Sequence, residues 1–187
     1  MTGTPRLLAI FSDSTRAMRE LERGVLDELN KIQRVDPPTF KVAYAFTAIP
    51  ARYALERRQW AEAAKLASPF NDTGSANTGT AGVLPATSNN IPWDRFVWAK
   101  AQIHFARAIG AARLGDVASA QREVETLAAI RQQLVESKGD YDWGKQVEIA
   151  RMIASGWLAH AEGKQEEALK EMRAAADLDD ATDKHPV

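Results

Sequence analysis

The stretch AHAEGKQEEALKEMRAAADL (159–178) predicts two helices that fold back on each other. Gly163 separates two segments rich in alanine, leucine and glutamate, and glycine tolerates the left-handed backbone conformation that commonly ends a helix. Gly163 and Lys164 therefore mark a tight turn between two antiparallel helices. The same reasoning extends to the rest of the chain.

This turn pattern occurs twice more. ALERRQWAEAAKLA (54–67) and AARLGDVASAQREVETLA (111–128) also carry an alanine five residues after the turn position. The three pairs of turn residue and alanine are Arg58 with Ala63, Gly115 with Ala120, and Gly163 with Ala168. In the first helix of each pair, small residues occupy matching sites at Ala51, Ala108 and Gly156. We expect three hairpins whose helices approach closely at these small residues, with the first match the weakest because Arg58 replaces the turn glycine.

Turn-forming residues divide the remaining chain. Apolar residues recur at spacings of three or four in 14–34, which predicts a lone helix, and Asp36-Pro37-Pro38 ends it. The three hairpins are expected at 41–69, 93–137 and 141–180, in a single domain spanning 1–187. Residues 70–92 are rich in Gly, Ser, Thr, Asn and Pro and nearly uncharged, which predicts a long loop. The chain is therefore expected to be all-α, with about seven helices.

These hairpins resemble the tetratricopeptide repeat (TPR), a helix–turn–helix unit of about 34 residues with small residues at fixed sites. The segments AIPARYALERRQWAEAAKL (48–66), ARAIGAARLGD (106–116) and MRAAADLDDATDKHPV (172–187) are also similar to one group of large bacterial TPR proteins. The resemblance covers most of 42–187. It implies hairpins stacked as a right-handed superhelix, with further repeats after Val187, so that the chain is a fragment of a longer array.

The composition argues against several function classes. The 24 basic residues are balanced by 25 acidic ones, so no net field attracts nucleic acid. The absence of cysteine excludes disulfides, thiolate nucleophiles and zinc sites built on sulfur. His104, His160 and His185 lack the paired spacing of a helical metal site. No pattern places a base beside a nucleophile, so we expect neither an enzyme nor a cofactor.

The apolar run LLAIF (7–11) is too short for a membrane span or for the core of a signal peptide. We therefore expect a soluble chain without a membrane span. Many exported proteins also lack cysteine, so the cytoplasm and the periplasm both remain open, as does an export signal removed before residue 1.

In TPR proteins the first helix of each hairpin lines a concave face. That register implies a peptide-binding groove formed by Arg52 from the first unit, by Phe105, Ile109 and Arg113 from the second, and by Ile153, Trp157 and His160 from the third. A largely apolar groove of this kind suits an amphipathic helix, or an extended peptide anchored by one aromatic side chain. Family members that grip a terminal carboxylate use lysine and asparagine where this chain has Phe105/Ile109 and Ile153/Trp157, so that mode is not expected. The alternative is that the same side chains are core, buried by neighbouring repeats or by the long loop.

The favoured hypothesis is a non-enzymatic scaffold for protein–protein interaction. A second hypothesis is a regulatory or accessory helical domain of a larger protein whose catalytic part lies elsewhere. A third is self-association through the exposed ends of the repeat stack, because a truncated solenoid presents an end surface that capping repeats would cover.

Overall fold

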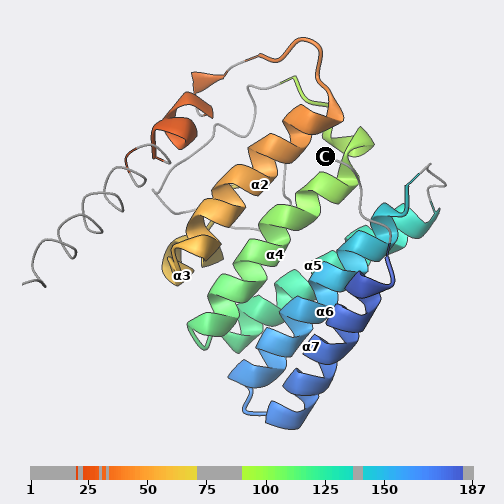
Figure 1. Cartoon of the computed structure of the whole chain (residues 1–187). Coiled ribbons are helices and arrows are strands. Elements are labelled where there is room, and N and C mark those ends of the chain that lie inside the picture. Colours follow the sequence, from red (N-terminus) through yellow and green to blue (C-terminus); the bar gives the residue numbers. More distant parts are fainter. Residues whose placement is uncertain are drawn as a thin grey trace, which may run out of the picture.

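The computed structural model describes residues 20, 23–29, 31–32, 34–70, 90–136 and 141–182. Within these ranges the regular secondary structure is helical and there is no strand, which confirms the all-α prediction. A short helical stretch at 23–29 precedes the main elements. These are α2 (Phe40–Glu56), α3 (Trp60–Ala64), the 3-10 helix η1 (Trp93–Arg95), α4 (Val97–Arg113), α5 (Val117–Glu136), α6 (Trp143–Ala161) and α7 (Gln165–Asp180) (Figure 1).

The helices pack as three consecutive hairpins, α2/α3, α4/α5 and α6/α7 (Figure 1). The first helix of each later hairpin contacts both helices of the hairpin before it. Thus α4 lies against α2 and α3 as well as its partner α5, and α6 lies against α4 and α5 as well as α7. The chain is therefore a stack of helical hairpins in a repeat-like arrangement.

All three hairpin turns have the same backbone geometry. The turn residue adopts a positive φ in each, +56° at Arg58, +76° at Gly115 and +81° at Gly163. Its amide donates to the carbonyl three residues earlier at 2.9–3.1 Å, and the following amide donates to the carbonyl five residues earlier at 2.9 Å in every turn. This is the Schellman motif, which satisfies carbonyls left over at the end of a helix. The three turns therefore share one hydrogen-bonding pattern, which matches the repeat of turn residues in the sequence.

Arg58 is the one residue other than glycine with a positive φ in the described part of the chain. A side chain in this conformation places its Cβ close to a carbonyl oxygen, at a cost of about 1–2 kcal/mol. We expect Arg58→Gly to raise the free energy of unfolding by up to about 1 kcal/mol, because the greater freedom of glycine in the unfolded chain offsets part of the gain. Denaturant melts measure the change. Gly115→Ala is the reverse test and should destabilise by about 1 kcal/mol, since open space surrounds Gly115 and only its backbone is strained.

The small residues mark close approaches between helices. Ala63 and Ala120 are completely buried, and Ala168 is nearly so. A Cβ atom built on Gly156 would lie 3.0 Å from the Met172 side chain and 3.2 Å from the carbonyl oxygen of Ala168. The predicted seam between α6 and α7 is therefore confirmed.

The tightest approach involves Gly110, which the repeat pattern does not single out. A Cβ atom at Gly110 would lie 2.4 Å from the amide nitrogen of Ala64 and 2.7 Å from the carbonyl oxygen of Trp60. Backbone cannot move aside as a flexible side chain can, so Gly110→Ala should separate α3 from α4 and cost about 1–3 kcal/mol. Gly156→Ala is the matched control and should cost less, because the Met172 side chain can adjust. Equal losses in chemical denaturation would contradict this packing.

The first hairpin is shorter than the sequence indicates. Its second helix was expected to continue towards residue 69, but α3 ends at Ala64. Pro69 disfavours helical geometry in the residue before it, and Arg107 binds the carbonyl of Leu66 and the hydroxyl of Ser68. Residues 65–70 therefore leave the helix and lie along α4.

The other expected boundaries hold closely where the structure describes them. The second hairpin begins with η1 rather than with a continuous helix from residue 93, and the third begins at Trp143 rather than 141. Most of the predicted helix at 14–34 and residues 71–89 of the predicted loop lie outside the described residues. Asn90, the first described residue after 71–89, is held by its side-chain amide, which donates to the carbonyl oxygen of Val35 and accepts from its amide nitrogen, both at 2.8 Å.

An aromatic row crosses the first helices of the three hairpins. The indole of Trp98 on α4 stacks on that of Trp143 at the start of α6, with ring centroids 3.9 Å apart and planes at 10°. Tyr44 on α2 also stacks against Trp98, with ring centroids 6.1 Å apart. Tyr141, just before α6, meets the ring of Trp143 edge to face, with centroids 4.7 Å apart. Trp98 is only 6% exposed. The row therefore joins α2, α4 and α6 at the end remote from the turns.

Candidate functional site

Two indole rings and a guanidinium group meet at the ends of three helices. The Cζ atom of Arg113, at the end of α4, lies 5.0 Å from the ring centroid of Trp60 on α3 and 4.8 Å from that of Trp157 on α6. Both distances are within the range of cation–π attraction. The guanidinium side chain is exposed, whereas both indoles are half-buried. We refer to Trp60, Arg113 and Trp157 as the indole–guanidinium cluster.

His160 extends this cluster along α6. Its ring meets the ring of Trp157 edge to face, with centroids 5.7 Å apart and planes at 87°. Its Nδ1 atom is 2.9 Å from Oε1 of Gln165 on α7. Because His160 is exposed and held by two neighbours, it adds a polar, oriented edge to the aromatic surface.

Arg113, Trp157 and His160 thus lie together, as three of the seven predicted groove residues. Phe105 and Ile153 are half-buried on α4 and α6, and Phe105 packs against the same core cluster as Trp157. Ile109 is buried at 6% exposure and contributes to the core. The groove as a binding site stays a prediction, and its exposed part is centred on the indole–guanidinium cluster.

Arg52 has different surroundings from the other predicted residues. Its Nε donates to Glu56 Oε1 at 3.2 Å within α2. It also lines a shallow hollow of about 280 Å³ together with Val25, Ile49, Tyr53 and Glu56. This hollow lies between α2 and the helical stretch at 23–29, so Arg52 is not grouped with Arg113.

Trp60 is the member of the cluster that the sequence reasoning missed. It lies two residues after the turn residue Arg58, at the position that Val117 and Gln165 occupy in the other hairpins. The register used for the groove considered only first helices, and Trp60 belongs to a second helix. A register that included the first turn of each second helix would have placed it beside Arg113.

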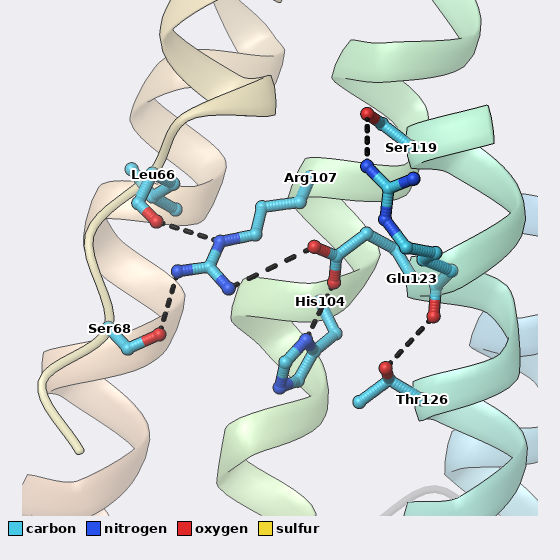
Figure 2. A network of polar contacts seen from close by, with 8 residues as sticks. Leu66, Ser68, His104, Arg107, Ser119, Glu123 and Thr126 are labelled. Carbon is cyan, nitrogen blue, oxygen red and sulfur yellow. Dashed lines mark hydrogen bonds and ion pairs between the residues drawn. The ribbon is translucent and has the colours of Figure 1, made fainter. Parts of the chain in front are cut away.

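A second group of polar side chains is buried between α4, α5 and the segment after α3 (Figure 2). His104 Nδ1 lies 2.7 Å from Glu123 Oε2, and Arg107 Nη1 lies 3.9 Å from the other carboxylate oxygen. Arg107 also donates through Nε to the carbonyl of Leu66 at 2.8 Å and through Nη2 to the hydroxyl of Ser68 at 2.7 Å. His104, Arg107 and Ser68 are each at most 5% exposed.

This buried network fits a structural role. Buried charges are tolerated when they are paired and hydrogen-bonded, and each of its charged groups has such a partner. The ring of Phe70 lies 5.9 Å from that of His104 and closes the network on one side. The Ser68 hydroxyl accepts a hydrogen bond from Nη2 of Arg107, so it is part of the same network. The network therefore anchors 66–70 to α4.

Glu148 on α6 joins two helices through a second charged group. Its carboxylate accepts two hydrogen bonds from Arg151, at 2.7 and 2.9 Å, and lies 3.0 Å from Nε of Arg131 on α5. The hydrogen bonds from Arg151 hold the pKa of Glu148 below its usual value, and the charge of Arg131 acts in the same direction. The ionised form is therefore the one that stabilises the α5–α6 contact.

The pH dependence follows from this shift. A carboxyl whose pKa is lower in the folded state contributes stability above its unfolded pKa of about 4.3, and loses it as the pH falls through the folded value. Glu148→Gln should therefore reduce the free energy of unfolding at pH 7 by about 1 kcal/mol, since the pair is partly solvated. The difference from the wild type should shrink below about pH 4. Urea melts at pH 7 and pH 3 check this, and a constant difference would contradict it.

The described residues contain no group of three or more potential metal ligands among histidine, cysteine, aspartate and glutamate. Over the same residues, no helix combines the length and apolar character needed to cross a membrane.

No protein-family model, curated protein or solved structure matches the chain. The relationship to TPR proteins therefore stays a prediction from the sequence.

Proposed function

We propose that this chain is a TPR-like, non-enzymatic scaffold that binds a peptide or helix of another protein. The binding surface is the side of α4 and α6 that carries Phe105, Ile153 and Trp157, with Arg113 and His160 at the end near the turns. Its mechanism is shape and aromatic anchoring on a rigid stack of hairpins. In this proposal the chain contributes no catalytic group.

The single observation that supports this best is the indole–guanidinium cluster. Tryptophan and arginine are the residue types most enriched among those that dominate protein–protein binding energy. Trp60, Arg113 and Trp157 come from α3, α4 and α6, one helix in each hairpin, and present one partly exposed surface. An arrangement that draws on all three hairpins requires the stack to be intact, as expected for a surface displayed by a scaffold.

The surroundings of the titratable groups favour binding over catalysis. Glu123 and Glu148 are each partly buried; Glu123 contacts His104 and Arg107, and Glu148 contacts Arg131 and Arg151. A carboxylate held in this way serves as an ion-pair partner, whereas acyl transfer and related chemistry need a base with a free acceptor atom. The same surface would serve an accessory domain of a larger enzyme, in which case the binding role proposed for this chain is unchanged.

The exposed face of α7 does not favour self-association through that helix. Leu169 is its one strongly exposed large apolar residue, and the other exposed positions are mostly charged. A single leucine among charged residues forms no contiguous apolar patch of the size that marks an interface.

Photocrosslinking at two exposed positions tests the proposal. Benzoylphenylalanine at His160 places the reactive group beside Trp157, whereas the same residue at Leu169 places it on the outer face of α7. In a lysate of the source organism, irradiation should give a discrete protein adduct from position 160. Position 169 is the matched control and should give none. An equal pattern from both positions, or no adduct from position 160, would contradict the proposed surface.

A further inference from the structure

We infer that the indole–guanidinium cluster is a carboxylate-recognition site, which takes an aspartate or glutamate of a peptide segment next to a large apolar residue. This inference rests on the proposed function, because it names the kind of peptide that the surface binds. The carboxylate would pair with Arg113, and the apolar neighbour would rest on the exposed parts of Trp60 and Trp157.

The contacts of Arg113 leave its hydrogen-bonding edge available. A guanidinium group carries five N–H donors in its plane, in a fork that matches a carboxylate. The two indoles contact Arg113 through their ring faces, which are not conventional acceptors. An arginine side chain has many rotamers, so one already held by two rings loses less freedom on binding than a free one. The cluster is therefore preorganised for a planar anion.

The carboxylates of the neighbouring turns are already engaged. Glu56 pairs with Arg52 at 3.2 Å, and Glu162 pairs with Lys164 at 2.9 Å. Asp116 accepts from the amide of Ser119 at 3.0 Å and so caps α5. Over the part of the chain that the structure describes, Arg113 has no carboxylate oxygen within 4.0 Å. Charge complementarity therefore points to a carboxylate supplied by a partner.

A peptide carboxylate fits better than a nucleic-acid phosphate. The chain has a formal net charge of −1, and the acidic side chains of all three turns lie close in sequence to the turn residues. A polyphosphate backbone needs several cations at regular spacing, whereas a single acidic side chain needs one arginine and an adjoining apolar surface. The cluster offers the second combination.

The test begins with a random dodecapeptide library displayed on phage and selected against the full chain. The wild-type protein should enrich peptides that carry aspartate or glutamate beside a large apolar residue. Arg113→Gln should still enrich apolar residues but lose the acidic preference. The matched control is Arg173→Gln, which removes an exposed arginine from α7 and should leave the preference unchanged. Circular dichroism melts verify that each variant is folded.

A selected peptide then allows a double-mutant cycle by fluorescence polarisation. Replacing its acidic residue by the corresponding amide should weaken binding to the wild type about tenfold, as expected for a charge-assisted hydrogen bond. The same replacement should have no effect on binding to Arg113→Gln. Arg113→Lys should recover only part of the affinity, because lysine lacks the planar fork.

The outcomes separate this inference from the proposed function. If no peptide is enriched by the wild type, the proposed binding surface fails. If peptides are enriched without an acidic preference, or if the preference survives in Arg113→Gln, the surface stands and the carboxylate site is overturned. A labelled dT20 oligonucleotide serves as a further probe. If the oligonucleotide binds the wild type but not Arg113→Gln, while peptide binding does not depend on Arg113, the cluster binds phosphate. That result would also overturn the inference.

Discussion

Replacing Trp98 by alanine should lower the free energy of unfolding by about 3–5 kcal/mol, the range for removal of a buried tryptophan. Trp98 is 6% exposed and stacks on Trp143 at 3.9 Å. Its loss would leave a cavity at the point where α2, α4 and α6 meet, and the partner indole would lose its stacking surface. Denaturant melts give the stability change. The near-ultraviolet circular dichroism of the native state should fall, because the stacked pair is removed.

Two variants provide controls for this prediction. Trp98→Phe keeps an aromatic ring in the row and should cost clearly less than Trp98→Ala. Trp60→Ala removes the same residue type from a half-buried position, and its smaller burial should give a smaller loss. If Trp98→Ala were as stable as Trp60→Ala, the aromatic row would not be a core element of the stack.

Replacing Arg107 by methionine should destabilise the chain by about 3 kcal/mol, the lower end of the range for breaking a buried ion pair. The loss falls at the lower end because Glu123 retains its contact with His104 and is partly exposed. Methionine preserves most of the side-chain volume, so the change reports the hydrogen bonds more than the packing. The carbonyl of Leu66 and the hydroxyl of Ser68 would both lose their donor.

A local readout distinguishes this network from a general loss of stability. Lys65 is exposed and directly precedes the segment that Arg107 holds. Under native conditions, trypsin should cleave after Lys65 faster in Arg107→Met than in the wild type, because release of 66–70 frees the backbone for the protease. Arg122→Met on α5 is the matched control. It replaces an exposed arginine and should change stability by no more than about 0.5 kcal/mol, with no effect on cleavage at Lys65.

The hairpins were predictable because their information is local. A left-handed residue after a helix and a small residue five positions later are set by steric limits on a few neighbouring residues. Gly115 and Gly163 satisfy these limits directly. Arg58 adopts the same conformation without being glycine, so the alanine spacing revealed the first turn even though its turn residue is unusual.

The tight contact at Gly110 shows where a repeat pattern stops being informative. The equivalent residues in the other hairpins are Tyr53 and Leu158, so no repeated feature marks this site. Its neighbours are backbone atoms of α3, and how closely two helices approach depends on packing over their whole length. The sequence indicated that small residues matter, but not that this glycine is the tightest.

The candidate site was predictable in part. Arg113, Trp157 and His160 share a helix face in the repeat register, and the structure places them together. Ile109 follows the same register yet is buried, because a register gives the direction of a side chain on its own helix and not the depth of the neighbouring helices. Trp60 joins the cluster from a different helix, which a register confined to first helices could not reveal.

The all-α class, the three hairpins and their turns could be inferred from the sequence, because helix periodicity and turn geometry depend on residues close together in the chain. The end of α3, the groups around Arg107 and the indoles that contact Arg113 became known only from the packing of the helices. Arg107 bonds Leu66 and Ser68, which lie about forty residues earlier in the sequence. Arg113 contacts indole rings from α3 and α6. Such contacts depend on how separate helices pack in three dimensions, and the same local patterns are compatible with many different sets of neighbours.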